Sequence, residues 1–236
     1  METYIIDADN IDGYLFFYNL TRNSNDFSML PVFELDHTAQ KIRNILKKHG
    51  SRKDIILNHR ELQEAFFSPF KPQLKNAQVF LSHSHADINK ALEVKNYLEN
   101  QIKRKVFIDS LFWDYKDDVL NKLAKYDDIS RIEDAFTLIL RESLEYMIKK
   151  CPYFVFLQSK NSVSNQGLSQ ITYSAWIYEE LRIANTFIAD TTIKESHIKA
   201  MRISYDITNL LRRFKPISLN GLCKKIAFNL ITKDAK

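Results

Sequence analysis

The sequence contains very little glycine, and this scarcity limits how a nucleotide could be bound. Only Gly13, Gly50, Gly167 and Gly221 occur among the 236 residues. Phosphate-binding loops of the P-loop and dinucleotide-fold types need several glycines close together, because backbone N–H groups must approach the phosphates. No such cluster is present, so the sequence excludes both loop types. Any bound nucleotide would need other groups to hold its phosphates.

Cysteine and long apolar runs are also scarce. Cys151 and Cys223 are the only cysteines, so the chain can build neither a disulfide framework nor a CxxC metal site. The start, METYIIDADN, is acidic and lacks the apolar segment of a signal peptide, and no apolar run reaches the ~18 residues of a membrane-spanning helix. We therefore expect a cytoplasmic protein with no bound metal and no membrane partner.

The net charge of +5 comes from the C-terminal part of the chain. Residues 191–236 carry ten basic and three acidic side chains, whereas residues 1–75 carry ten of each and residues 76–190 carry fourteen basic and sixteen acidic. A basic tail is compatible with an acidic partner such as nucleic acid. However, no aromatic residues interleave with these charges, as a groove for a nucleic-acid strand would require. We therefore expect no nucleic-acid partner and interpret the basic residues as solvated helix faces.

The pattern of the sequence changes near residue 75. Residues 1–75 form a mainly helical N-terminal extension of unknown role, and its clearest element is a helix within HTAQKIRNILKKHG. Pro69 and Pro72 mark the boundary. Residues 76–236 form the second domain, in which short apolar strands alternate with amphipathic helices.

The second domain predicts an α/β fold. Fully apolar strands that alternate with helices are typical of a flavodoxin-like parallel sheet with helices on both faces. The stretch 110–151 is a long helical insertion, and SQITYSAWIYEELRIANTFI (169–188), which contains SAWIYEEL (174–181), is a later helix. The strands are expected at 77–82, 105–109 and 152–158, with further strands near 201–205 and 216–219 and a last helix at 220–230.

A polar turn follows each of the first three predicted strands: SHSHAD, DSLFWDYKDD and QSKNSVSN. In parallel sheets, ligands bind beyond the carboxyl ends of the strands, where such turns gather. The helix that contains SAWIYEEL follows the third turn. The sequence therefore predicts a cleft lined by Ser82, His83, His85, Asp109, Trp113, Trp176 and Glu180.

Four stretches, in this order, resemble the motifs of a TIR domain (Toll/interleukin-1 receptor), specifically bacterial antiphage TIR proteins of the Thoeris kind. VFLSHSHAD resembles the first strand and its serine-rich turn, and VFIDSLFW resembles the second strand with its acid and tryptophan. YFVFLQSKNSVSN resembles the third strand with its serine-containing exit. SAWIYEEL is similar to the Ser-x-Trp-x-x-x-Glu-Leu pattern of the family. The resemblance covers roughly residues 77–230, and the long helical stretch 110–151 departs from it.

The resemblance implies cleavage of the bond between nicotinamide and ribose in NAD⁺, which would be the substrate, with no further cofactor. Nicotinamide leaves as a neutral base, so positive charge develops on the ribose, and a carboxylate beside it stabilises that charge. Glu180 is the candidate carboxylate and Trp113 the candidate wall for the nicotinamide ring. Ser82 and His83 could bind the phosphates. The product would be ADP-ribose, a cyclic isomer or a conjugate that acts on a separate effector protein.

Other interpretations of single residues stay open. Asp109 either binds ribose or caps the next turn, and Trp113 lies either in the cleft or in the core. Trp176 shares a helix face with Glu180 and is better explained as the core residue that sets this helix than as a substrate contact. Glu179 points about 100° away from Glu180, which predicts a solvent-facing side chain.

The resemblance also leaves two matters about partners open: whether a phage-derived molecule activates the protein, and whether copies of the chain form a homo-oligomer. Two alternatives compete with the NADase hypothesis. One is a non-catalytic TIR scaffold, and the other is an enzyme like the nucleoside deoxyribosyltransferases, which also rely on a carboxylate beside a ribose.

Overall fold

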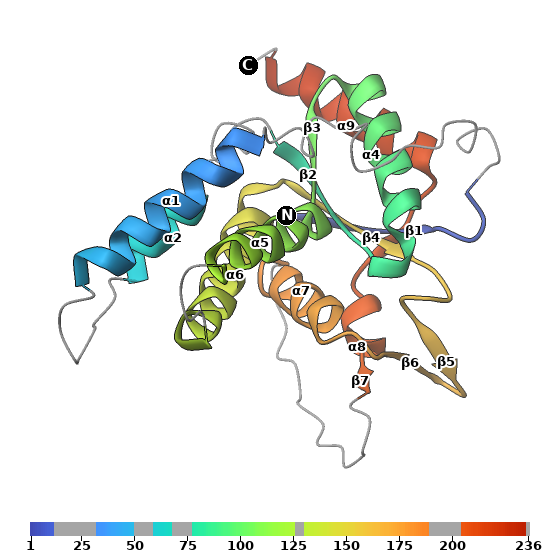
Figure 1. Cartoon of the computed structure of the whole chain (residues 1–236). Coiled ribbons are helices and arrows are strands. Elements are labelled where there is room, and N and C mark those ends of the chain that lie inside the picture. The colour runs from blue at the N-terminus through green and yellow to red at the C-terminus, as the bar shows by residue number, and fades with distance from the viewer. Residues whose placement is uncertain (12–31, 50–58, 68–76, 126–129, 189–203, 235–236) are drawn as a thin grey trace.

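A five-stranded parallel sheet lies at the centre of the computed structural model, which describes residues 1–11, 32–49, 59–67, 77–125, 130–188 and 204–234 (Figure 1). The sheet therefore gives the chain an α/β architecture compatible with a flavodoxin-like fold, as the sequence predicts. The spatial order is β3-β2-β4-β1-β8, and all the pairs are parallel. The strands are β1 (Glu2–Asp7), β2 (Ala77–Ser82), β3 (Lys105–Ile108), β4 (Tyr153–Gln158) and β8 (Lys215–Pro216).

The N-terminal strand β1 corrects the predicted extent of the sheet. Glu2–Asp7 lie between β4 and β8, paired residue by residue with Tyr153–Gln158. The sequence places these residues in an N-terminal extension of unknown role, where YIIDAD is compatible with either a strand or a helix fragment. Counted from β2, the strands β3-β2-β4 follow the 2-1-3 order of flavodoxin-like sheets. The next position belongs to β1 rather than to a strand that follows β4 in the chain.

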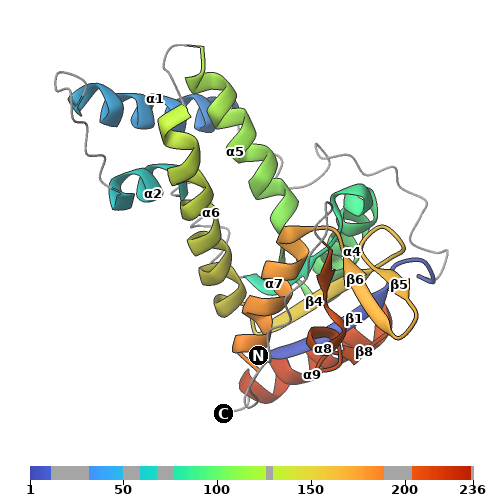
Figure 2. The same ribbon diagram turned by 90° about the horizontal axis from the view of Figure 1, so that it is seen from below.

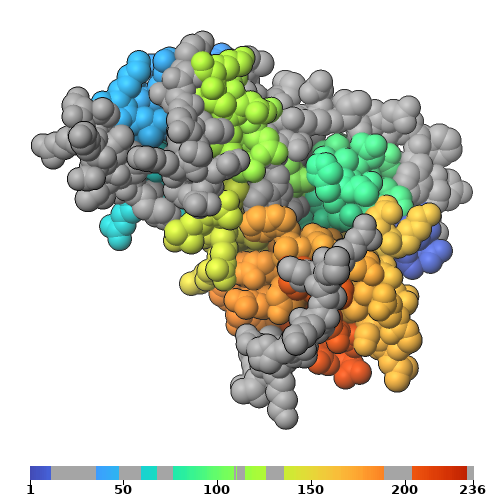
Figure 3. All heavy atoms as spheres, turned by 60° about the horizontal axis from the view of Figure 1, so that its bottom comes forward, coloured from blue at the N-terminus to red at the C-terminus, as the bar shows by residue number. Residues whose placement is uncertain are grey.

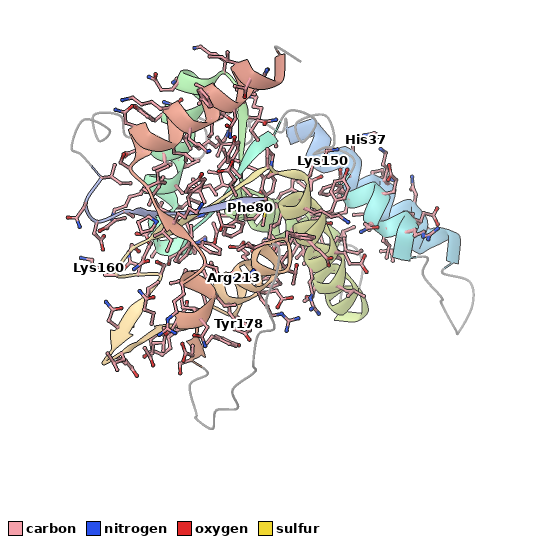
Figure 4. All side chains as sticks on the ribbon, turned by 180° about the vertical axis from the view of Figure 1, so that it is seen from behind. His37, Phe80, Lys150, Lys160, Tyr178 and Arg213 are labelled. Atoms are coloured by element: carbon pink, nitrogen blue, oxygen red, sulfur yellow. The ribbon has the colours of Figure 1, made fainter. Side chains whose placement is uncertain are left out.

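Helices cover both faces of the sheet (Figure 1). On one face, α4 (Ile88–Ile102) packs beside α9 (Leu219–Asp234). The other face carries α7 (Ala175–Thr186) and parts of α5 (Asp109–Leu123) and α6 (Ser130–Lys150). Phe80 lies between these layers, where it stacks on Phe107 and Phe154 of the neighbouring strands (Figure 4). None of the helices formed by the described residues is long and apolar enough to cross a membrane.

The two N-terminal helices pack against the helical insertion. Figure 2 shows α5 and α6 extending beyond the sheet to meet α1 (Val32–His49) and α2 (His59–Phe67). Phe66 of α2 contacts the rings of Tyr115 and Phe136, with centroids 5.4 and 5.1 Å away. The Tyr115 hydroxyl donates to Thr38 of α1 at 2.7 Å. The long insertion therefore provides the surface on which these helices are stabilised.

A small antiparallel sheet combines a hairpin that precedes α7 in the chain with a strand that follows α7. It contains β5 (Ser164–Gln166), β6 (Ser169–Thr172) and β7 (Tyr205–Asp206). Gly167, with φ of +61°, provides the left-handed residue that the tight β5–β6 turn requires. The prediction of a helix from residue 169 is therefore wrong for Ser169–Thr172. Part of the predicted strand near 201–205 lies outside the described residues, and its end belongs to β7. The remaining short elements are η2 (His85–Asp87) and α8 (Thr208–Leu211).

Candidate functional site

The chain changes direction between β2 and β4, the two central neighbours in the sheet. After β2 it enters α4, on the face that α9 also covers, whereas after β4 it reaches α7 on the opposite face, beside α6. Where neighbouring strands lead to opposite faces, their exits diverge and leave a crevice at the carboxyl edge of the sheet. The fold thus places the candidate site between the exits of β2 and β4.

Buried polar side chains gather at this carboxyl edge, and each is at most 4% exposed. Burial of a polar group costs free energy unless hydrogen bonds compensate, so such a concentration is typical of a functional site rather than of a core. Two of these residues, Ser82 and Glu180, are 0% exposed. The set consists of Ser82, His83, Asp87, Ser110, Ser159, Ser162 and Glu180.

A short hydrogen bond joins the last residue of β2 to helix α7. The Ser82 hydroxyl donates to Oε2 of Glu180 at 2.5 Å, inside the protein. The structure thereby brings together two of the residues that the sequence predicts for one site. Figure 3 shows the outer side of α7, in orange, at the surface between α6 and the β5–β6 hairpin. Glu180 faces the opposite, buried side of the helix.

The residues of SAWIYEEL have separate structural roles. Ser174 is the N-cap of α7, and its hydroxyl accepts the N–H of Ile177 at 3.2 Å. Trp176 is partly buried against the core, as expected for the residue that sets the helix, and Leu181 is fully buried. These contacts fix the helix so that Glu180 points towards Ser82.

Glu179 differs from its predicted solvent-facing state. Its side chain is only 17% exposed and forms ion pairs with Arg141 of α6 at 2.9 Å and with Arg182 at 3.5 Å. This contact has no signal in the sequence, because the position of α6 beside α7 is a tertiary feature. The two adjacent acids nevertheless have different roles. Glu179 joins α7 to α6 near the surface, whereas Glu180 is buried at the edge of the sheet.

Asp87 connects the exits of β2 and β4, although it is not among the site residues predicted from the sequence. Its Oδ2 accepts the Ser159 hydroxyl at 2.5 Å, and its Oδ1 accepts the Asn161 side-chain amide at 2.8 Å. The turn after β4 is closed by further bonds between Ser159 and Ser162. The polar stretches HSHAD and QSKNSVSN indicate that both turns carry candidate functional groups. They do not indicate that Asp87 contacts Ser159 and Asn161.

Asp9 brings the exit of β1 to the same edge. Its carboxylate accepts the backbone N–H of Lys160 at 2.9 Å and pairs with Lys90 of α4 at 3.0 Å. The N–H of Lys160 and the charge of Lys90 hold the pKa of Asp9 below its ordinary value. Lys150 and Lys160, which precede and follow β4, mark the two ends of this strand in Figure 4. Three strand exits are therefore joined by carboxylates.

The remaining predicted residues are only partly placed. His83 is buried beside Ser82 in the chain, whereas His85 is exposed. Asp109 and Trp113 belong to the first part of α5, but their side chains lie outside the described part of the chain. Ile108 occupies the N-cap position of α5, so Asp109 is the first residue of the helix rather than its cap. Within the described ranges, no cluster of histidine, cysteine and acidic side chains could hold a metal ion.

A pocket of about 310 Å³ lies elsewhere, between α1 and the end of α5. Three of its seven described lining residues are basic, and none of the seven belongs to the sheet edge. The described residues around it are Asp36, Ala39, Gln40, Arg43, Lys122, Leu123 and Lys125.

Comparison of the chain with models of known protein families, with curated proteins and with solved structures found no match. The interpretation of the site therefore depends on its own residues and their geometry.

Proposed function

We propose that this chain is a TIR-type NAD⁺ nucleosidase of antiphage defence, with Glu180 as its catalytic carboxylate. One observation carries the proposal: Glu180 is buried at the carboxyl edge of the parallel sheet and accepts a 2.5 Å hydrogen bond from Ser82. This contact joins the first and the last of the four TIR-like motifs. Active sites are where buried carboxylates recur despite their cost.

The reaction needs one carboxylate and a protected site. The C–N bond between ribose and nicotinamide breaks, and its electron pair leaves with the neutral nicotinamide. The ribose then carries an oxocarbenium-like charge, which the negative charge of Glu180 would stabilise in a site shielded from water. Addition of water at C1′ with loss of a proton gives ADP-ribose, whereas attack by an adenine nitrogen gives a cyclic isomer. No acid is needed to protonate the leaving group.

The neighbouring residues have proposed roles in binding. Ser82 orients the carboxylate of Glu180, and with His83 it lies where a phosphate or ribose hydroxyl would be held. Trp113 would form the wall for the nicotinamide ring, and Asp109 would bind a ribose hydroxyl. Trp176 supports α7 from the core side. The released nucleotide product would then act as a signal to a separate effector protein.

The test compares the two adjacent acids of α7. Glu180→Gln keeps the shape of the side chain and an oxygen that can accept from Ser82, but removes the charge. We expect NAD⁺ cleavage to fall at least about a hundredfold, as when a group that stabilises transition-state charge is removed. Glu179→Gln is the matched control, because it removes an ion pair with Arg141 without altering the buried site.

Nicotinamide release should be measured by mass spectrometry with purified protein, alone and with extract from phage-infected cells. The extract is included because a phage-derived activator is part of the proposal. Thermal melting would confirm that both variants fold. Wild-type rates of cleavage in Glu180→Gln would refute the role of Glu180.

A non-catalytic interaction module is the second candidate, and one observation favours it. Glu180 and Ser82 are 0% exposed, so in this conformation neither touches solvent. A scaffold would use the same buried contact to stabilise the fold. Two results together would support the hypothesis of a non-catalytic module. The wild-type protein would cleave no NAD⁺ under any condition, and Glu180→Gln would lose much of its stability.

A further inference from the structure

Ligand access to Glu180 requires a structural change at the edge of the sheet. Glu180 and Ser82 are completely buried, and His83 beside them is 3% exposed. A substrate of any kind must contact a side chain to use its charge. The crevice between the exits of β2 and β4 is therefore closed in this structure, and the contacts that cross it determine how it can open.

Two sets of hydrogen bonds between described residues lie at this edge of the sheet, and they differ in exposure. The deeper set is the bond from Ser82 to Glu180, between groups that are 0% exposed. The outer set joins Asp87, which is 2% exposed, to Ser159 and to the exposed residue Asn161. Exposure thus increases from the carboxylate of Glu180 to the amide of Asn161. Asp87 and its two donors therefore connect the turn after β2 with the turn after β4, and Asn161 is the member of this set that reaches the solvent.

The turn after β4 is held together by its own hydrogen bonds, which involve no residue of β2. The Ser159 N–H donates to the Ser162 hydroxyl at 2.8 Å, which itself donates to the Ser159 carbonyl at 3.0 Å. The Ser159 hydroxyl also accepts the N–H of Asn161 at 3.0 Å. These bonds stay within the turn, so they survive if the turn separates from β2. The bonds to the single carboxylate of Asp87 are the ones that would break.

We propose that the bonds of Asp87 to Ser159 and Asn161 form a latch that closes the crevice over Glu180. Opening separates the turn at residues 159–163 from the turn at residues 83–87 and exposes Ser82 and Glu180. The bond from Lys160 to Asp9 lies on the exposed side and holds the same turn only weakly, because an exposed hydrogen bond exchanges readily with water. The latch controls access whatever ligand the site binds, so it does not depend on NAD⁺ as substrate.

The latch is tested by the reactivity of a thiol at the buried position. Ser82→Cys introduces a near-isosteric thiol there, and its alkylation by iodoacetamide is followed by peptide mass spectrometry. Cys151, which is 1% exposed and lies just before β4, is an internal reference for unfolding of the core. On this background, Asp87→Asn removes the charge that binds both donors. Asn161→Ala removes only the outermost bond and is the milder variant if Asp87→Asn folds poorly.

We expect the thiol at position 82 to react at least about tenfold faster with Asp87→Asn, since a buried hydrogen bond to a charged group is lost. The increase with Asn161→Ala should be smaller, and the Cys151 rate should stay unchanged. Asp206→Asn, which alters a carboxylate on β7 bonded to the Thr208 N–H, should change neither rate. Equal alkylation rates at position 82 in Ser82→Cys alone and in Ser82→Cys with Asp87→Asn would overturn the proposal. A parallel rise at Cys151 would also overturn it, because unfolding of the core rather than a local opening would then expose the site.

Discussion

The hydroxyl of Ser82 lies 2.5 Å from Oε2 of Glu180, although the two residues are 98 positions apart in the chain. Ser82 ends β2, and Glu180 lies in the second turn of α7. The contact depends on the parallel sheet, which brings the exits of β2 and β4 to one edge, and on Ser174 and Trp176, which fix the start of α7. It therefore connects the fold directly to the proposed chemistry.

Ser82→Ala should reduce NAD⁺ cleavage by about ten- to a hundredfold while the protein stays folded. The buried carboxylate of Glu180 loses a short hydrogen bond that orients it, and loss of such a bond costs roughly 1.5–3 kcal/mol. Initial rates of nicotinamide release would measure the effect. Ser84→Ala is the control, because Ser84 follows two residues later and its side chain makes no capping bond to the helix. Equal losses of activity in both variants would contradict a specific role for Ser82.

The sequence predicts the local elements of the second domain well because their signals are local. The apolar runs AQVFLS, KVFI and YFVFLQ form β2, β3 and β4 close to the expected boundaries. Polar turns at their ends mark the sheet edge, and helical spacing marks α4 and α7. The meeting of Ser82 with Glu180 follows from this topology, so it could be predicted before any coordinates existed.

Contacts between distant segments could not be predicted in this way. The run ETYIID pairs with β4 about 150 residues later, and no local pattern indicates this partner. The bonds that Ser159 and Asn161 donate to Asp87 likewise span more than 70 residues. The β5–β6 hairpin is missed because SQIT precedes a true helix without a strong break, although Gly167 is a turn signal. Tertiary packing decides each of these cases.

Ile6→Ala should destabilise the protein by about 2–5 kcal/mol, the range for truncation of a buried isoleucine in a core. Ile6 is 2% exposed near the end of β1, where it pairs with Leu157 of β4. If residues 1–75 were dispensable for the sheet, the variant would melt like the wild type. Urea denaturation gives the free energy of unfolding. Leu168→Ala is the control, because this side chain is 99% exposed and its truncation should cost almost nothing.

Glu99→Gln should be strongly destabilising, by about 3 kcal/mol, because it removes the charge that faces a fully buried lysine. Lys95 is 0% exposed and pairs with Glu99 one turn later in α4, and Glu99 also accepts the N–H of Val106 at 2.9 Å. Glutamine can still accept the N–H of Val106, so the loss of stability measures the effect of removing the charge of Glu99.

The double variant Lys95→Met with Glu99→Gln should recover most of this stability, since an apolar side chain removes the buried charge. Chemical denaturation of the single and double variants measures the coupling. Lys105→Met, which removes the longer 3.8 Å contact with Glu99, should change the free energy of unfolding by less than about 1 kcal/mol. A double variant no more stable than Glu99→Gln would show that the charge of Lys95 is not the cause.

The carboxyl group of Glu2 should make stability depend on pH in the acid range. Partial burial opposes its ionisation, but the hydrogen bond from Tyr4 and the charge of Lys225 outweigh this effect and lower its pKa from 4.5. Because the folded-state pKa lies below the unfolded value, ionised Glu2 stabilises the fold above about pH 4.5. That contribution is lost as the pH falls through the folded-state pKa.

The difference in unfolding free energy between wild type and Glu2→Gln should therefore be constant near neutral pH and shrink below pH 4.5. Urea titrations between about pH 3 and 7 would measure it. Tyr4→Phe should weaken the same dependence, because the Tyr4 hydroxyl donates to Glu2 at 2.5 Å. Glu145→Gln, on the exposed surface of α6, is the control and should leave the acid profile of the wild type intact. A difference that stays constant down to pH 3 would mean that Glu2 acts through shape and hydrogen bonding rather than through its charge.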